Sequence, residues 1–219
     1  MTDEPGLGPD EQVEAIRRAR SLGGLRRAAV QCRACGLWER ATQTVFGEGT
    51  EGARLMFLGE QPGDAEDRAG HPFVGPAGRI LDRALAAVGI DRDDVYITNV
   101  VKHFTWRRAP RGKRRIHQRP DRAEEVACRP WLEAEVARIG PVLIVCLGAT
   151  AAQALLGRSF RVTRQRGQVL PTSLGPQAMA TIHPSAVLRA TDDAARAAAY
   201  DGLVADLAMA AGHLRPPGS

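Results

Sequence analysis

The chain alternates short, continuous apolar runs with longer segments whose apolar residues recur at helical spacing. The short runs lack the polar alternation of a half-exposed strand, so they predict strands that are buried on both faces. Four such runs lie at residues 54–60, 95–101, 141–148 and within 177–184. Helical segments are expected at residues 11–30, 79–89, 121–139, 149–157 and 192–213. Pro130 is expected to kink or restart the third of them, because proline cannot donate the helical hydrogen bond.

This order of elements predicts an α/β fold. Strands that alternate with helices and are apolar throughout favour a parallel sheet covered on both faces. We therefore expect a three-layer α/β/α sandwich with a central, mainly parallel, four-stranded sheet. A single domain is predicted over residues 11–213, with disordered ends at 1–10 and 214–219.

Composition and charge narrow the class of protein. The 219 residues carry a formal net charge of +5, which suits a polyanionic partner such as nucleic acid. No apolar run approaches the roughly 20 residues that cross a bilayer. The first residues are polar and acidic, unlike a signal peptide, so a cytoplasmic protein is expected. The sequence pattern does not predict a partner subunit, so we expect a monomer that does not contact a membrane.

The most basic segment of the chain contains a single histidine. Residues 107–119 hold no acid, and His117 lies among seven positive residues: Arg107, Arg108, Arg111, Lys113, Arg114, Arg115 and Arg119. A solvated loop with an idle histidine is one interpretation. A loop that meets a polyanion is the other.

Polar and aromatic residues follow each of the predicted strands. In open α/β sheets ligands bind beyond the carboxyl ends of the strands, so topology gathers these residues at one edge. They are Glu60, Gln61, His71, Phe73, Asn99, His117 and His183. Each also has a plain structural interpretation, as a turn former, a core aromatic or a satisfied histidine.

The four cysteines suggest a metal site. In a reducing compartment a C-x-x-C pair with two further cysteines favours metal binding over disulfides. The candidate ligands are Cys32, Cys35, Cys128 and Cys146. From spacing alone the metal is zinc or an iron–sulfur cluster. The alternative is that Cys128 and Cys146 are buried thiols that pack like small apolar residues.

Three motifs resemble those of the uracil-DNA glycosylase superfamily. They are "LGEQPGDAEDRAGHPFVGPAG", "YITNVVKH" and "TIHPSAVLRA", and they occur in the family's order. The chain is similar to the bacterial iron–sulfur branch. "KRRIHQRP" resembles the added loop of the UdgX-type enzymes, which attach covalently to uracil-containing DNA. The four cysteines also resemble the family's ligand set, which implies a [4Fe–4S] cluster that is structural.

The resemblance and the chemistry of the side chains assign the same roles at the base. A glycosylase takes its base out of the stack, and Phe73 offers a face on which uracil can stack. The Asn99 amide matches the N3–H and O4 edge of uracil, whereas cytosine reverses that pattern. His183 can donate to O2 as negative charge develops there.

For the sugar, we interpret His117 as the nucleophile that bonds to C1′. A neutral imidazole can attack directly, with Glu60 taking its proton or orienting the ring, and Gln61 holding the geometry. Arg115 would anchor the loop to a phosphate or to neighbouring backbone. The residues expected to position the DNA or the loop are Lys113, Arg114, Arg115, Ser185 and Arg189. Leu188 would lie near the gap left by the base, or pack on the core.

The expected partner is uracil-containing DNA, single-stranded in the first place, with double-stranded DNA left open. A turnover glycosylase that releases uracil and leaves an abasic site is the alternative within the same fold. A redox-sensing iron–sulfur protein that binds nucleic acid without catalysis is the rival from another class, and a zinc-binding module is a lesser one.

Overall fold

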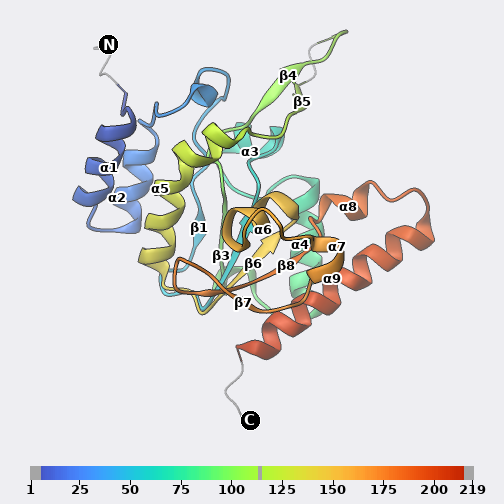
Figure 1. The fold of residues 1–219 in the computed structure, drawn as a ribbon. Helices are drawn as coiled ribbons and strands as arrows, with labels where there is room; N and C mark the ends of the chain where they lie inside the picture. Colours follow the sequence, from blue (N-terminus) through green and yellow to red (C-terminus); the bar gives the residue numbers. More distant parts are fainter. Residues whose placement is uncertain (1–5, 113–114, 215–219) are drawn as a thin grey trace.

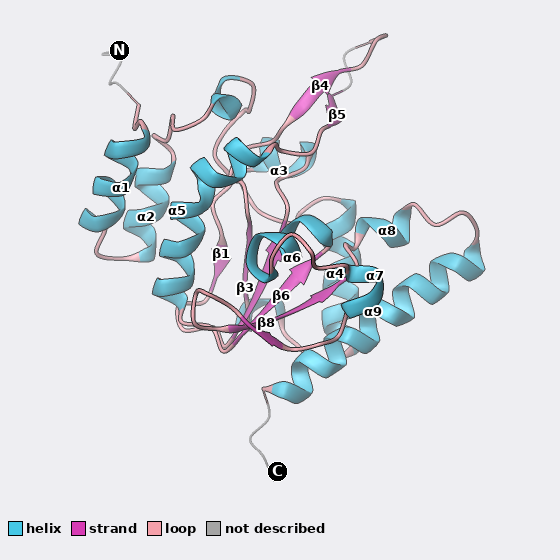
Figure 2. Ribbon diagram, viewed as in Figure 1, coloured by secondary structure: helices cyan, strands magenta, loops and turns pink. Residues whose placement is uncertain are grey.

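The structure is a computed structural model that describes residues 6–112 and 115–214. Its main sheet has six strands, and Figure 2 shows them enclosed by helices. In spatial order the strands are β1 (Glu48–Gly49), β3 (Tyr96–Asn99), β2 (Leu55–Gly59), β6 (Leu143–Leu147), β8 (Gln177–Thr181) and β7 (Leu170–Pro171).

The four predicted strands form the parallel centre of this sheet, and the predicted fold class is confirmed. The pairs β2–β3, β2–β6 and β6–β8 are all parallel. The prediction of four strands in total is wrong, because β1 and β7 add one antiparallel strand at each edge. Each of these edge strands has only two residues, too few to show any periodicity in the sequence.

Helices cover both faces of the sheet, as Figure 1 shows. One face carries α1 (Pro9–Arg18), α2 (Leu22–Ala29), α5 (Arg122–Ile139), α6 (Ala149–Leu156) and α7 (Val162–Gln165). The other carries α4 (Pro76–Ala87), α8 (Ser185–Leu188) and α9 (Asp193–His213). The remaining short helices are η1 (Gly36–Glu39), α3 (Asp64–Ala69) and η2 (Arg92–Asp94).

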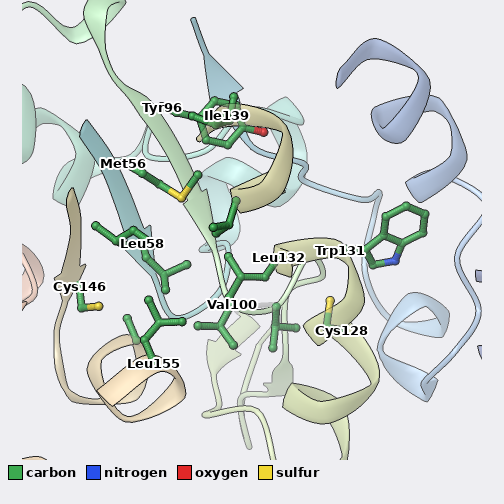
Figure 3. Close-up of a cluster of buried hydrophobic side chains, with 14 of the residues drawn as sticks. Met56, Leu58, Tyr96, Val100, Cys128, Trp131, Leu132, Ile139, Cys146 and Leu155 are labelled. Atoms are coloured by element: carbon green, nitrogen blue, oxygen red, sulfur yellow. The ribbon is translucent and has the colours of Figure 1, made fainter. Parts of the chain in front are cut away.

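The core is divided in two by the sheet. Successive strand residues point to opposite faces, so Met56 and Leu58 join the cluster under α5 and α6. Leu55 and Phe57 join the cluster under α4 and α9. Figure 3 shows part of the first cluster, in which residues from β2, α5 and α6 meet. Apolar residues on both faces explain why the strands read as unbroken apolar runs.

The helices differ in places from those predicted. The segment predicted at 11–30 forms two helices, α1 and α2, and α4 begins three residues before the predicted start at 79. Helix α1 begins at Pro9, within the segment that was expected to be disordered. Helix α5 runs unbroken from Arg122 to Ile139 with Pro130 inside it, because a capping box of Asp121 and Glu124 starts it and its apolar side is buried. No helix among the described residues is long and apolar enough to cross a membrane.

The basic segment forms a β-hairpin rather than a loop. Strand β4 (Trp106–Arg108) pairs with β5 (Arg115–His117), and the hairpin extends beyond the body of the molecule in Figure 1. Trp106 is the direct partner of His117 in this ladder. The predicted positioning residues Lys113 and Arg114 lie outside the described residues.

Candidate active site

The carboxyl ends of the parallel strands bring the candidate residues together. Gly59 at the end of β2 is in register with Asn99 at the end of β3. Glu60 and Gln61 come directly after β2, and His183 comes two residues after β8. The edge that topology predicts is therefore the edge at which the side chains meet.

Phe73 and Asn99 approach the backbone of Gly59. A Cβ atom on residue 59 would lie 2.2 Å from Asn99 Oδ1 and 2.7 Å from Phe73 Cζ, so only glycine fits there. Phe73 has φ 55°, the one positive φ of a non-glycine residue in the described part of the chain. Such a conformation is costly for a bulky side chain and is typical of functional sites.

The amide of Asn99 is buried with unused hydrogen-bonding capacity. Its side-chain Oδ1 has no hydrogen-bond partner among the described residues, although Asn99 is only 1% exposed. A buried polar atom without a partner is costly, so this acceptor is suited to a donor on a ligand. The backbone carbonyl of Asn99 accepts a 2.7 Å hydrogen bond from Lys102 Nζ.

Lys102 belongs to a buried ion pair behind Asn99. Its Nζ lies 2.5 Å from Glu135 Oε2, and both side chains are almost fully buried. Glu135 also accepts hydrogen bonds from the hydroxyls of Tyr96 and Thr98. Buried charges need a hydrogen-bond partner for each polar atom. Here the ion pair and its hydrogen bonds hold the end of β3 in one arrangement.

His183 is held as a neutral hydrogen-bond donor. Its Nδ1 accepts a 3.1 Å hydrogen bond from the Ser185 N–H and lies 2.7 Å from Ser185 Oγ, so the ring proton is on Nε2. Burial, with smaller contributions from Arg189 and His117, lowers the pKa of His183 to about 4. Arg189 donates to Ser185 Oγ at 2.6 Å. Ser185 and Arg189, predicted to position DNA, here support His183.

His117 lies between the two residues that follow β2. Its Nε2 is 2.8 Å from Gln61 Nε2 and 3.6 Å from Glu60 Oε1. Because Gln61 donates through this nitrogen, neutral His117 carries its proton on Nδ1 and a lone pair on Nε2. About half of the His117 side chain is exposed, at 51%, so the ring is open to a ligand. Glu60 in turn accepts a hydrogen bond from the Thr150 hydroxyl.

Gln61 attaches the hairpin to the sheet. Its Oε1 accepts from the Thr105 N–H at 2.9 Å, and its Nε2 donates to the Gln118 carbonyl at 2.6 Å. These partners flank the two strands of the hairpin. The side chain therefore sets the position of the hairpin base, and with it the position of His117.

Arg115 anchors the hairpin to α3 through carboxylates. It forms ion pairs with Asp64 and with Asp67, the latter at 2.5 Å, and only 10% of its side chain is exposed. The guanidinium lies 5.2 Å from the ring centroid of Phe104 and 5.5 Å from that of Trp106. Arg115 Nη2 also donates to the Asp64 backbone carbonyl at 3.4 Å, so the backbone partner that the sequence suggested is present. Two acids and two aromatic rings complete its surroundings.

The structure brings most of the predicted site residues to one place. The rings of Phe73 and His183 have centroids 6.0 Å apart. His117 is near enough to His183 to contribute to its lowered pKa. Leu188 is 45% exposed, so it is not the core residue of the alternative interpretation.

Three of the four cysteines lie within electrostatic reach of one another. Burial raises the pKa of Cys128 to about 12, Lys102 offsets part of that shift, and the thiols of Cys32 and Cys35 add to it. Cys128 Sγ accepts from the Lys102 N–H at 3.2 Å, and Cys32 Sγ accepts from the Gln12 amide at 3.8 Å. Hydrogen bonds of this kind commonly support cluster thiolates.

Cys146 lies apart from these three. Burial alone raises its pKa to about 12, with no contribution from another thiol. Figure 3 shows its sulfur on β6, away from Cys128, with Leu58, Val100 and Leu155 drawn between them. In the described part of the chain no three acidic, cysteine or histidine side chains converge on a single-ion site. Cys146 therefore fits a packed thiol better than a fourth ligand.

Several residues of the site carried no role in the sequence analysis. Lys102 and Glu135 were missed because a buried ion pair far apart in sequence leaves no local pattern. His103 follows Lys102 and is also buried, and burial lowers its pKa to about 4. The signal that could have found it is its place in the quoted segment "YITNVVKH", directly after a strand.

A mainly parallel α/β sandwich with convergent polar groups at the carboxyl edge of its sheet is the architecture of an α/β enzyme. Comparison with known families shows to which enzyme family the chain belongs. A sequence profile described as "Uracil DNA glycosylase superfamily" matches residues 46–208. The chain belongs to this superfamily.

Type-4 uracil-DNA glycosylases are among its relatives. The enzyme of Thermotoga maritima is 41% identical over 160 residues, which cover 73% of this chain and 79% of the relative. That of Archaeoglobus fulgidus is 37% identical over 175 residues, 77% of this chain and 83% of the relative. That of Sulfurisphaera tokodaii is 37% identical over 153 residues, 68% and 66% of the two chains.

Proposed function

We propose that the protein excises uracil from DNA as a repair enzyme and is left covalently attached, through His117, to C1′ of the deoxyribose. The observation that carries the proposal is the position of His117 Nε2, 2.8 Å from Gln61 and 3.6 Å from Glu60 at the same edge as Asn99 and His183. Membership of the superfamily and the type-4 relatives support the excision step. The attachment step rests on the geometry of the hairpin.

Uracil is recognised by three side chains in this proposal. It stacks on Phe73, and its N3–H donates to the unpartnered Oδ1 of Asn99 while O4 accepts from the same amide. The Nε2–H of neutral His183 donates to O2, where negative charge accumulates as the base departs. Because the tautomer of His183 is set by Ser185, the donor is in place before the reaction begins.

The covalent step exchanges one bond of C1′ for another. The bond from C1′ to uracil N1 breaks, and its electron pair leaves with the base, which then takes up a proton. The lone pair on His117 Nε2 forms the new bond to C1′. The alkylated imidazole is a cation until its Nδ1 proton passes to solvent. Glu60, a carboxylate 3.6 Å from Nε2, stabilises that positive charge and the charge that develops on the sugar.

A turnover glycosylase is the second candidate function. The relatives are named simply as type-4 uracil-DNA glycosylases, which favours it. In that case water attacks C1′ in place of His117, and the products are uracil and an abasic site. Recognition by Phe73, Asn99 and His183 is the same in both cases, so only the fate of the sugar differs.

A [4Fe–4S] cluster is the proposed cofactor, with a structural role. Cys32, Cys35 and Cys128 suit it, because they are mutually close and accept N–H hydrogen bonds. For the fourth ligand we propose His103 in place of Cys146. The N–H of the preceding residue, Lys102, bonds to Cys128, and Arg33 between the first two cysteines contributes to the lowered pKa of His103. Neutral imidazole is an established iron ligand.

The test is a reaction of purified protein with a uracil-containing oligonucleotide, resolved on a denaturing gel. The wild type should give a slow-migrating protein–DNA band, and His117→Ser should not. The serine variant should still release uracil, because the base is bound by other residues and the smaller side chain admits water. A full yield of the covalent band from His117→Ser would refute the attachment, whereas a wild type that releases no uracil would refute the excision.

A further inference from the structure

A groove lined by arginines lies beside the candidate active site and takes no part in the chemistry above. It encloses about 830 Å³ between α5, α6 and the segment that follows α6. Its floor is apolar and includes Val100, Leu132 and Leu155. Its walls carry five arginines: Arg119, Arg122, Arg129, Arg158 and Arg161.

The charge of this groove is poorly compensated. Glu125 is the one acid among the lining residues. Burial raises the pKa of Glu125, although the positive charges of Arg119, Arg122 and Arg158 act to lower it. The guanidinium groups of Arg122 and Arg158 form no hydrogen bond or ion pair with any described residue. Arg129, by contrast, is paired with Glu133 at 2.6 Å. Unpartnered guanidinium groups around a hollow are suited to phosphate oxygens.

The groove lies near the edge that holds His117. Arg119 lines it and is one residue away from Gln118, whose carbonyl bonds to Gln61. Glu125 is close enough to Glu60 for the two carboxylates to interact electrostatically. A DNA strand whose nucleotide occupies the site therefore has a basic path open to it along α5 and α6.

We propose that this groove binds the phosphates of single-stranded DNA on one side of the excised uracil. Its volume, about 830 Å³, is that of a small-ligand site and suits a short stretch of one strand. The apolar floor suits sugars and bases, and the arginine walls suit the backbone. This inference rests on the proposed function, since uracil at the site sets which part of the strand reaches the groove.

The experiment compares the double variant Arg122→Gln/Arg158→Gln with wild type on single-stranded uracil oligonucleotides whose flanks are shortened from one end at a time. The measured quantities are the maximal single-turnover rate and the protein concentration that gives half of it. Removing two phosphate contacts should raise that concentration about 25-fold at 0.1 M salt and lower the salt slope by about 1.4. The maximal rate should not change.

The matched control is Arg17→Gln/Arg27→Gln, which removes two exposed arginines from α1 and α2. It should behave as wild type. Shortening one flank, but not the other, should abolish the difference between the groove variant and wild type. If the half-maximal concentration of the groove variant rose equally on short and long flanks, or did not rise, the proposal would be overturned. Fluorescence anisotropy with the same strands measures binding to the groove without any release of uracil. A wild type that releases no uracil would therefore refute the proposed function but leave the groove proposal testable.

Discussion

Replacing Asn99 by alanine tests whether its buried amide reads uracil. The side chain is 1% exposed and Oδ1 has no partner in the described part of the chain, so its hydrogen bonds are available to a base. Alanine would leave N3–H and O4 of a bound uracil without partners. Each unmet group costs about 1–3 kcal/mol, which together predicts a loss of roughly 30-fold to 10⁴-fold in the excision rate.

The fold should tolerate this change. The contact that Asn99 makes with the buried ion pair is through its backbone carbonyl, which alanine retains. Circular dichroism and thermal unfolding of the variant should therefore match those of the wild type. The assay is single-turnover release of uracil from a labelled single strand, followed together with the yield of the covalent band.

A second substitution makes the test directional. Asn99→Asp keeps Oδ1 but replaces the amide donor by oxygen, so O4 of uracil loses its partner. An acceptor at that position suits the N4 amino group of cytosine instead, and the ratio of cytosine to uracil excision should rise. If Asn99→Ala released uracil at the wild-type rate, the amide would not face the base, and the assignment of the whole site would be wrong.

Three further predictions address the cluster, the hairpin and His183. Cys128→Ala should lose most of its iron and Cys146→Ala should keep it, as measured by iron content and absorbance; wild-type iron in Cys128→Ala would remove Cys128 from the ligand set, and loss of iron from Cys146→Ala would contradict the proposal of His103 in its place. Arg115→Leu leaves the buried Asp67 carboxylate unpaired, at a cost of about 3–5 kcal/mol, and should lower covalent yield more than uracil release; an equal loss of both would contradict separate roles. Burial lowers the pKa of His183 to about 4, against about 6.5 in the unfolded chain, so stability should decline as pH falls from 6.5 towards 4. Urea unfolding should show a weaker decline in His183→Gln, and an unchanged slope would contradict the depressed pKa.

The central sheet could be predicted because its residues are apolar on both faces. Leu55 and Phe57 enter one core while Met56 and Leu58 enter the other, so the run is continuous and its length defines the strand. The hairpin could not be predicted from such a pattern. Arg107 and Arg108 in β4 are exposed, and their pairing with β5 depends on Arg115 reaching acids about 50 positions earlier in the chain.

The candidate site could be predicted as far as strand order determines it. Asn99 and Glu60 lie at strand ends, and their convergence follows from a parallel sheet. Arg115 was predicted to anchor the hairpin to a phosphate or to backbone, and the backbone carbonyl of Asp64 is one of its partners. Its pairing with Asp67 was not predicted, because tertiary packing brings that carboxylate to the guanidinium. The sequence cannot decide the role of Cys146 for a similar reason: a thiol in an apolar strand and a thiol in a cluster look the same in sequence.

The site is built from two parts that are attached to the fold by different contacts. Asn99 is held by the sheet and by the buried Lys102–Glu135 pair, so the base-binding part belongs to the core. His117 is carried by a hairpin whose ties to the body include the Gln61 amide and the Arg115 ion pairs. Trp106 Nε1 also donates to the Arg40 carbonyl at 2.9 Å. Because these ties are independent of the ion pair behind Asn99, substitutions in the two parts should act on different steps. Under the proposed function, base recognition therefore depends on the sheet, whereas covalent capture depends on the hairpin attached to its edge.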